Sequence, residues 1–274
     1  MAPRKRILFG WKPEWEAGLR KSTDPAEFEV VMAELGHVDF ADCDAVVPLD
    51  LRDHNWLDAF GGSVPALTVP GSVRRMCHDK LVLNNRLIDL GFGDAIPRLH
   101  ERLPADLSDA PILIKARMGS FGKNIHLLQS NRIPEVIDGL LAAGSHFIQD
   151  YTPGSTEYAT HVLIHQGAPK FWLTNEYVMG EAPCIKGVAK RALRARWLKE
   201  TPGQGVFQQM LKAIGFDRGT CCIDYRMVDG HPRLFEINPR FGGSLSWNVA
   251  AYLRSYVACV DRDQSGGADK VEAT

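Results

Sequence analysis

One segment of the chain, residues 224–240 with the sequence DYRMVDGHPRLFEINPR, constrains the fold more than any other. It reads as two strands joined by a tight Asp229-Gly230 turn, since an Asp-Gly pair between alternating apolar residues is a strong hairpin signal. Side chains alternate between the two faces of a strand, so Glu236, Asn238 and Arg240 are expected on one face. The second strand of the hairpin is therefore expected to have one polar face.

The opposite face of this strand is expected to carry Phe235 and Ile237, while Asp224 on the first strand is expected on the polar face. Carboxylate and amide oxygens are ligands for a hard cation, and a guanidinium beside them can bind phosphate. A solvent-exposed polar hairpin face is the alternative. The run that follows, Phe241-Gly242-Gly243-Ser244, favours a binding site, because glycine lets the backbone approach a ligand closely.

Length and charge limit the function classes. The 274 residues suffice for one large or two to three small domains, and a hydrophobic content of 45% supports a full core. A formal net charge of −1 argues against a general attraction to nucleic acid or to an anionic membrane. No apolar run approaches the roughly 18 residues of a membrane span, and the N-terminal residues lack the pattern of a secretory signal. We expect a cytoplasmic protein without nucleic-acid or membrane partners.

The six cysteines show no CxxC pair and no metal-ligand spacing, so neither a zinc site nor a disulfide framework is predicted. Reduced and mostly buried thiols are expected instead. His161 and His165 are four residues apart on a predicted strand without a third ligand nearby, and they are interpreted as ordinary strand residues.

Residues 1–76 alternate between strand and helix patterns. Strands are expected at Arg6–Gly10, Ala45–Leu49 and Ala66–Pro70, with a helix from Pro25 to Leu35, which together indicate a small, mostly parallel α/β unit. Polar and aromatic residues at or after these strand ends either decorate loops or take part in binding, since α/β sheets place ligands there. These residues are Trp11, Trp15, Asp50, Arg52, His54 and Trp56.

Two lysines in the next part of the chain stand in unfavourable places. A helix is predicted from His78 to Leu90 with Gly91 as its stop, and Lys80 in its first turn opposes the helix dipole. Lys115 interrupts the apolar strand 111–116, which is costly unless the amine is paired or faces an anion. Both lysines therefore indicate a role other than stability.

A glycine-punctuated loop, RMGSFGKN, follows this strand and precedes another at Ile125–Leu128. Such a loop can fold over polyphosphate with backbone N–H groups as donors, although it does not match the Walker pattern. A helix is expected over Ser130–Ala143, then a strand over His146–Asp150. Residues 151–157 break that strand and form a hinge between two lobes, and a hairpin follows, with strands at 158–165 and 170–178.

The segment Lys186–Lys199 is rich in Lys and Arg and has no acidic residue, which fits either a solvated face or an anion-binding role. A helix is predicted over Pro202–Ile214, with Thr201 as its N-cap and Gly215 as its stop. A last helix is expected over 245–257, and the chain from Asp261 is expected to be a frayed tail.

In this order the parts resemble the ATP-grasp superfamily, which includes D-alanine–D-alanine ligase, biotin carboxylase and carbamoyl phosphate synthetase. The resemblance covers about residues 77 to 257, and its most specific piece is the sequence Glu236-Ile237-Asn238-Pro239-Arg240 with Asp224 upstream. It implies an α/β (α+β) fold in which two lobes, residues 77–152 and 153–260, clasp ATP. A small Rossmann-like domain, residues 1–76, would precede them, and a flexible tail, 261–274, would follow.

The resemblance also implies the residues of an ATP site. Lysines would contact the phosphates, the glycine-rich loop would close over them, hinge backbone would bind adenine, and a glutamate would hold the ribose hydroxyls. The matching residues are Lys80, Lys115, Gly119, Ser120, Gly122, Gln149, Asp150, Tyr151, Thr152 and Glu157. The hinge acid, Asp150, stands where glutamate is more usual.

By the same resemblance Mg2+, with Mn2+ as an alternative, would be held by Asp224, Glu236 and Asn238, and Arg240 would steady the transferred phosphoryl group. Some ligases place an arginine two residues before the first metal-binding acid, where this chain has Cys222. Candidates for stabilising the tetrahedral intermediate are therefore drawn from the basic segment: Lys186, Arg194 and Arg196.

The implied activity is an ATP-dependent carboxylate–amine ligase that acts through an acyl phosphate on small-molecule carboxylate and amine substrates. Two alternatives stay open: a small-molecule kinase of the same fold, and a nucleotide-binding regulatory protein without turnover. The substrates and the oligomeric state have no signature in the sequence, and a homodimer is the common prior for the latter.

Overall fold

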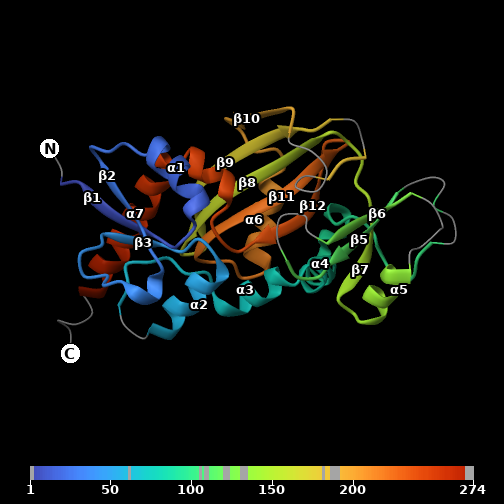
Figure 1. Ribbon diagram of the computed structural model, residues 1–274, viewed down its shortest axis with the longest axis horizontal. Coiled ribbons are helices and arrows are strands. Elements are labelled where there is room, and N and C mark those ends of the chain that lie inside the picture. The colour runs from blue at the N-terminus through green and yellow to red at the C-terminus, as the bar shows by residue number, and fades with distance from the viewer. Residues whose placement is uncertain are drawn as a thin grey trace.

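The computed structural model describes residues 3–60, 63–104, 107, 111–119, 124–129, 135–180, 183–185 and 192–268. Three β-sheets follow one another along the long axis of the molecule (Figure 1). The N-terminal sheet lies at one end, a five-stranded sheet lies in the middle, and a four-stranded sheet lies at the other end. None of the described helices is long and apolar enough to cross a membrane.

The N-terminal sheet is parallel, in the order β2-β1-β3. Its strands are β1 (Lys5–Phe9), β2 (Phe28–Met32) and β3 (Ala45–Val47), and its helical segments are α1 (Pro13–Ser22), η1 (Leu35–His37) and α2 (Leu51–Phe60). The prediction of a mostly parallel α/β unit is confirmed. The predicted helix over 25–35 is wrong, because this segment holds β2. The helix precedes it and begins with Pro13, with acids in its first turn and bases in its last, as the helix dipole favours. The strand expected at 66–70 is reduced to a single bridge between Ala66 and Val46.

Two short helices, α3 (Gly71–His78) and α4 (Lys80–Leu87), occupy the place of the helix predicted over 78–90. They are separated at Asp79, whose side chain accepts hydrogen bonds from the backbone N–H groups of Leu81 and Val82 and so caps α4. A π turn, η2 (Ile88–Phe92), and a 3-10 turn, η3 (Gly93–Ala95), follow. Gly91 has φ = +89°, so the predicted stop is confirmed.

The four-stranded sheet is antiparallel, in the order β4-β7-β5-β6. Its elements are β4 (Leu99–His100), β5 (Ile112–Ala116), β6 (Ile125–Leu128), α5 (Glu135–Ala142) and β7 (His146–Asp150). The strands predicted at 111–116, 125–128 and 146–150 are confirmed. The helix predicted over 130–143 is confirmed for 135–142, and residues 130–134 lie outside the described part. Ile112 and Ile114 pack with Ile137 of α5, which leaves Leu113 and Lys115 on the opposite face.

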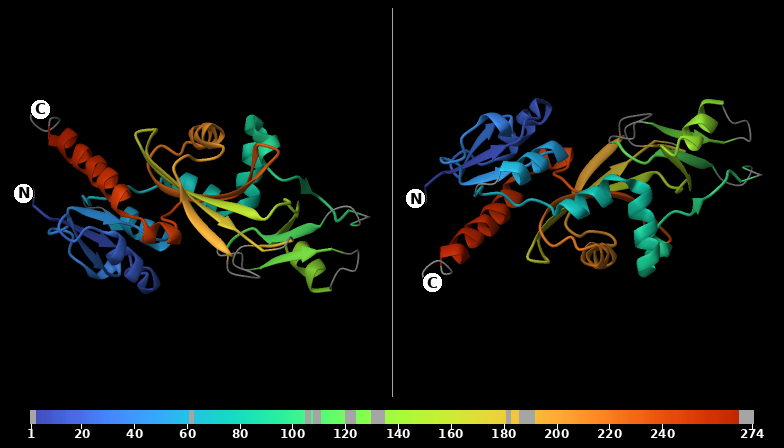
Figure 2. Two further views of the ribbon diagram at one scale, coloured as in Figure 1. Left: turned by 90° about the horizontal axis from the view of Figure 1, so that it is seen from above. Right: turned by 90° about the horizontal axis from the view of Figure 1, so that it is seen from below.

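The central sheet is also antiparallel, in the order β10-β9-β8-β11-β12. Its strands are β8 (Thr156–His165), β9 (Ala168–Val178), β10 (Arg194–Leu198), β11 (Gly219–Val228) and β12 (His231–Asn238), and α6 (Gln204–Ala213) precedes β11. Helices α4 and α6 lie on one side of this sheet, and the four-stranded sheet lies on the other (Figure 2). Both predicted hairpins are confirmed, and Asp229 and Gly230 have φ of +50° and +79°, as a type I′ turn requires.

Helix α6 confirms the helix predicted over 202–214 and its stop at Gly215, which has φ = +74°. The predicted N-cap is wrong, because Gly203 occupies that position. The Thr201 hydroxyl is instead hydrogen-bonded to the Thr174 hydroxyl, at 2.8 Å.

The chain ends with η4 (Gly243–Trp247) and α7 (Ala250–Ala268). The frayed tail predicted from Asp261 is wrong as far as residue 268, because α7 continues and Asp263 binds Arg218 at 2.6 Å and His165 at 2.8 Å. Residues 269–274 lie outside the described part.

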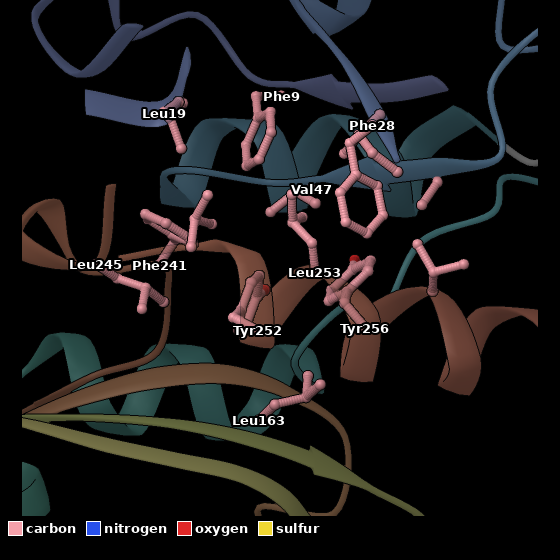
Figure 3. Close-up of a cluster of buried hydrophobic side chains, with 14 of the residues drawn as sticks. Phe9, Leu19, Phe28, Val47, Leu163, Phe241, Leu245, Tyr252, Leu253 and Tyr256 are labelled. Atoms are coloured by element: carbon pink, nitrogen blue, oxygen red, sulfur yellow. The ribbon is translucent and has the colours of Figure 1, made fainter. Parts of the chain in front are cut away.

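Helix α7 returns to the N-terminal sheet and completes its core (Figure 3). Tyr252 and Tyr256 of α7 are fully buried beside Phe9, Phe28 and Val47. The Tyr256 hydroxyl donates to the carbonyl of Val46 at 2.8 Å and accepts from the N–H of Leu67 at 2.7 Å. The two ends of the chain therefore share one hydrophobic core.

Candidate active site

A cavity of about 780 Å³ lies between the two lobes. Its walls come from the cavity-facing sides of both sheets, from α1 and from the segment after β12. Ten residues predicted from the sequence line it: Lys80, Lys115, Gly119, Tyr151, Thr152, Glu157, Asp224, Glu236, Asn238 and Arg240. Ser120, Gly122 and Lys186 fall outside the described residues.

The polar face of the hairpin forms part of this wall. Asp224 and Glu236 are directly opposite each other in the β11–β12 register. The side-chain amide of Asn238 donates to Asp224 Oδ2 at 3.2 Å and to Glu236 Oε1 at 2.8 Å. One amide group therefore contacts both carboxylates, so their oxygens converge on a single point. Arg240 lies beside them, with its Nη2 at 3.4 Å from Asn238 Oδ1.

A β-bulge between this face and the hinge changes the predicted side-chain alternation. Asp224 pairs with Glu236, but the next residue, Tyr225, pairs with Leu234, so Phe235 is the extra residue of β12. Phe235 consequently lines the cavity together with Glu236, whereas Ile237 is buried in the core behind the sheet. The expectation that Phe235 shares the face of Ile237 is wrong for this reason.

The two lysines reach the cavity from different elements. Lys80, the first residue of α4, places its Nζ at 3.3 Å from Glu236 Oε2 and donates to the carbonyl of Gly119 at 2.8 Å. Lys115 of β5 donates to Gln149 Oε1 at 3.1 Å and to the carbonyl of Phe235 at 3.3 Å. Both ammonium groups therefore contact β12, the strand that carries Glu236. Lys115 also contacts Gln149 at the hinge.

Lys115 is buried, with 4% of its surface exposed. Burial lowers the pKa of its amine from 10.5 to about 8, because an ammonium group loses solvation there. The nearby charge of Lys80 acts in the same direction, while Glu236, Glu157 and Asp224 oppose it. The site therefore holds a cation whose charge is costly until an anion binds.

An ion pair that the sequence did not reveal fixes the position of Lys80. The Arg117 guanidinium, just after β5, donates to both carboxylate oxygens of Asp79, the residue that caps α4. Partial burial opposes the ionisation of Asp79, but hydrogen bonds from Arg117 and from backbone N–H groups hold its pKa below the usual value. The backbone N–H of Lys80 also donates to the carbonyl of Arg117 at 2.9 Å.

The side chains of the hinge divide between the two faces of β7. Gln149 lies beneath Lys115, with its amide oxygen accepting from the amine and its amide nitrogen donating to the carbonyl of Pro97. Asp150 points to the other face of β7, where its carboxylate is 2.6 Å from the His100 ring. Strand alternation explains this division. Neither side chain lines the cavity, whereas Tyr151 and Thr152 do.

Arg226 is a site residue that the sequence-based prediction missed. It lies two residues after Asp224 on β11, lines the cavity, and has only 2% of its surface exposed. Its guanidinium donates to the Tyr151 hydroxyl at 2.9 Å and to the carbonyls of Thr152 and Cys184, both at 2.7 Å. It is also 3.5 Å from Glu157 Oε2. The argument used for Lys115, a cation on an apolar strand, would also have identified Arg226.

The basic segment does not meet the expectation for Arg194 and Arg196. Both are on β10, and both interact with Glu176, which is 2.6 Å from Arg196 Nε and 3.9 Å from Arg194 Nη2. Strand alternation turns Ala195 and Trp197 toward the cavity instead. Neither arginine lines the cavity in which the prediction had them stabilise an intermediate.

Aromatic residues form a further part of the cavity wall. Trp15, Trp197 and Trp247 line it together with Cys222 and Ser244, and the Ser244 hydroxyl is 2.8 Å from Nε2 of the buried His161. His161 therefore supports a residue of the cavity wall, and His165 anchors α7 through Asp263.

A second cavity of about 220 Å³ adjoins the first and is lined by Lys12, Asp50 and Arg52. Lys12 and Arg52 both pair with Asp50, at 3.2 and 3.1 Å. Asp50, Arg52 and Trp15 thus lie at a cavity. Trp11, His54 and Trp56 do not line either of the two cavities described.

The six cysteines are free thiols, and all except Cys43 are buried, as predicted. The described residues contain no cluster of three or more His, Cys, Asp or Glu side chains suited to a metal ion.

The arrangement of the two lobes matches solved structures along nearly the whole chain. D-alanine–D-alanine ligase from Bacillus anthracis has a TM-score of 0.62 at 14% identity, covering 97% of this chain and 100% of its own. D-cycloserine synthetase has a TM-score of 0.60 at 18% identity, covering 94% and 99%. L-amino acid ligase from Bacillus licheniformis has a TM-score of 0.56 at 16% identity, covering 90% of this chain and 70% of its own. No family model and no curated protein matches the sequence.

The chain has the ATP-grasp fold. The fold predicted from the sequence is thereby confirmed, and identities of 14 to 18% in these three comparisons limit the likeness to the fold. The cavity lies between the two lobes of this fold, so the packing of the lobes brings Lys80 and Lys115 toward Asp224 and Glu236.

Proposed function

We propose that the protein is an ATP-dependent carboxylate–amine ligase that forms an acyl phosphate and releases ADP and phosphate. One observation carries the proposal: Lys80 and Lys115 from one side and Asp224, Glu236 and Arg240 from the other line a single cavity. Three structural neighbours support it, since their names are those of ligases or synthetases of amino acids or amino-acid analogues. A second structure of the Bacillus anthracis enzyme was determined in complex with ATP.

ATP would lie along the cavity from the hinge to the carboxylate face. The base would lie at Tyr151 and Thr152 against Leu113 and Phe235, which provide apolar and aromatic surface. Glu157 would accept hydrogen bonds from the ribose hydroxyls, because it faces the cavity next to the hinge. The ammonium groups of Lys80 and Lys115 would bind the phosphates, which would also offset the cost of burying Lys115.

A divalent cation, Mg2+ or Mn2+, fits between Asp224 and Glu236. Two converging carboxylates with an amide oxygen and substrate phosphates form an oxygen donor set of the kind that Mg2+ prefers. The amide nitrogen of Asn238 now faces both carboxylates, so its oxygen would serve as a ligand after the amide turns over. When bound, the cation would neutralise phosphate charge during transfer.

In the reaction the substrate carboxylate oxygen attacks the γ-phosphorus of ATP, and the bond to the β-phosphate oxygen breaks to release ADP. The amine nitrogen then attacks the acyl carbon, loses its proton, and displaces inorganic phosphate. Lys80, Lys115 and Arg240 would hold the phosphoryl oxygens in place, so catalysis would rest mainly on positioning and electrostatics. Arg240 lines the cavity and Arg194 does not, so Arg240 replaces Arg194 as our candidate for stabilising the tetrahedral intermediate. The same role for Lys186 stays a prediction.

Replacement of Glu236 tests the proposal. Glu236→Gln removes a carboxylate that contacts Lys80 and Asn238 on a partly exposed face, so we expect the melting temperature to stay within about 3 °C of the wild type. ADP formation should fall at least a hundredfold. Glu101→Gln, on an exposed residue of the first lobe, is the control. Full ADP formation by Glu236→Gln would refute the assignment.

Hydroxylamine identifies the type of acceptor. An acyl phosphate reacts with hydroxylamine to give a hydroxamate, whereas a phosphorylated hydroxyl does not. Formation of a hydroxamate with ADP would support a ligase, and ADP release without a hydroxamate would indicate a kinase. The substrates to be tried are small carboxylic acids and amines, with mass spectrometry of the product.

A further inference from the structure

The cavity continues beyond the carboxylate face, away from the hinge. Arg226, Asp224 and Cys222 follow one another on the cavity side of β11, each pair about 7 Å apart along the strand. Arg226 contacts the hinge, so Cys222 marks the opposite direction. A Cβ atom at Gly242 would lie 2.9 Å from Cys222 Cβ, which shows that the chain after β12 closes over this position.

Three tryptophans from three separate elements line this cavity, and we call the part of the wall that they form the tryptophan chamber: Trp15 of α1, Trp197 of β10 and Trp247 of η4. The Trp15 ring lies on Gly243, where a Cβ would be 3.0 Å away. The Trp247 ring lies against Gly18 of α1, at 3.1 Å by the same measure.

The Trp197 ring is joined to the same group through His161. The centroids of the two rings are 6.1 Å apart, and His161 in turn contacts the Ser244 hydroxyl. Ser244 follows Gly243, on which Trp15 lies. Contacts between neighbours therefore link all three indole rings around one space.

Exposure distinguishes two of these rings from ordinary core tryptophans, whereas Trp15 is 8% exposed and also packs in the core of the N-terminal sheet. Trp247 is 57% exposed although it lines a cavity, and Trp197 is partly exposed. Scattered exposed apolar residues need no explanation, but aromatic side chains that converge on one cavity are typical of ligand sites. Trp11 provides the contrast, because it is 45% exposed and does not line the cavity.

We propose that one of the two substrates carries an aromatic or large apolar side chain that packs among Trp15, Trp197 and Trp247. This inference rests on the proposed function and names the substrate class for that site. The reacting carboxylate or amine of this substrate would point from the chamber to the Asp224–Glu236 face, one residue pair along β11.

The polar groups of the chamber agree with this class. Among the described residues, the chamber wall offers the Ser244 hydroxyl and the Asn175 amide, which lies opposite Trp197 in the β9–β10 register and has a buried Oδ1 without a hydrogen-bond partner. These groups are neutral, and charged groups of the cavity lie toward the carboxylate face, at Arg240 and Glu236. A charged side chain bound among the indole rings would lose its hydration and gain only neutral partners from Ser244 and Asn175. An aromatic or branched aliphatic group would lose only unfavourable contact with water.

The first experiment measures ADP release with Mg2+-ATP and L- and D-amino acids, singly and in pairs. Phenylalanine, tyrosine, leucine and methionine represent the proposed class, and alanine, aspartate and lysine are the comparison set. We expect the first group to give kcat/KM values at least tenfold higher. Equal or better turnover with the comparison set would overturn the inference while leaving the ligase assignment intact.

The second experiment uses variants of the chamber. Trp247→Ala should raise the KM of the preferred amino acid about tenfold or more and change the KM of ATP less than twofold. Trp197→Phe keeps an aromatic ring, so its KM for the preferred amino acid should stay close to the wild-type value. Trp11→Ala, an exposed tryptophan outside the cavity, is the control. A rise in the KM of ATP instead would show that the indoles hold the nucleotide, which would overturn the inference.

Calorimetry separates this inference from the proposed function. Binding of L-phenylalanine and L-leucine to the full chain in the presence of Mg2+-ADP does not require turnover. Binding that Trp247→Ala weakens tenfold would support the chamber even where no ADP is released. Binding of neither amino acid, together with ADP release driven by small or charged acids, would refute the chamber alone.

Discussion

Arg226 provides a test of how the nucleotide site is held together before ATP binds. Its guanidinium lies 5.3 Å from the ring centre of Tyr151 and 5.6 Å from that of Phe235. It also donates to the carbonyls of Thr152 and Cys184, and its Nη2 lies 3.5 Å from Glu157 Oε2. We infer that Arg226 positions the hinge and orients Glu157 toward the ribose.

Replacement of Arg226 by methionine keeps much of the apolar stem and removes the charge. Glu157 is 5% exposed, so it would lose a cationic partner in a buried place, and the carbonyls of Thr152 and Cys184 would lose donors. Removing one member of a buried pair costs about 3 to 5 kcal/mol. At roughly 2 to 4 °C per kcal/mol for a domain of this size, the melting temperature should fall by about 10 °C.

The decisive readout is the preference for ATP over 2′-deoxy-ATP, measured by calorimetry at a temperature where every variant is folded. A well-placed Glu157 should give the wild type a preference of about tenfold, the value of one hydrogen bond to a charged group. Arg226→Met should bind both nucleotides with nearly equal affinity, because Glu157 is no longer oriented.

Arg233→Met is the matched control, since Arg233 lies opposite Arg226 in the β11–β12 register and does not line the cavity. It should preserve both the melting temperature and the preference. The inference is wrong if Arg226→Met unfolds earlier but keeps the wild-type preference, since that would make Arg226 purely structural. It is also wrong if both quantities stay unchanged.

Two further predictions concern Lys115 and the last helix. With a pKa of about 8, Lys115 should lose its charge above pH 8, so ATP affinity should fall there by up to tenfold per pH unit. Calorimetry from pH 6.5 to 9.5 should show this fall for the wild type and no such fall for Lys115→Met. The folded pKa lies below the unfolded value of 10.5, so the unfolded chain binds more protons than the folded chain between pH 8 and 10.5. The free energy of unfolding of the wild type, measured by denaturant melts relative to Lys115→Met, should therefore rise with pH by roughly 3 kcal/mol across that window. Asp263→Asn removes the ion pair with Arg218 at 2.6 Å, and it should lower the melting temperature by a few degrees, seen by calorimetric scanning, while ATP affinity stays unchanged.

The sequence revealed those site residues whose chemistry conflicts with their local setting. Lys115 was found because a lysine on an apolar strand is costly, and the structure places it buried against Gln149 and the cavity. Glu236 and Asn238 were found from alternation within a strand. The same alternation failed for Phe235, because a β-bulge adds one residue to β12, and a bulge has no reliable signal in a single sequence.

Residues that act through tertiary packing were not predictable. Asp79 and Arg117 are 38 residues apart, and only the folded chain shows that their ion pair fixes α4 against the end of β5. The basic segment failed for the opposite reason. Its charges are conspicuous in the sequence, but the register of β10 on β9 pairs Arg196 with Glu176, away from the cavity.

The last helix connects the architecture of the N-terminal unit to the chemistry of the cavity. Strand β12 carries Glu236 and Asn238, continues through Gly243 and η4, and then enters α7, whose tyrosines lie in the core of the N-terminal sheet. Because α1 belongs to that same unit, Trp15 and Trp247 come together only when both ends of the chain are packed. One continuous segment, residues 236–247, therefore joins Glu236 of the carboxylate face to Trp247 of the tryptophan chamber. A substrate held by the chamber is held in register with the groups that would activate it.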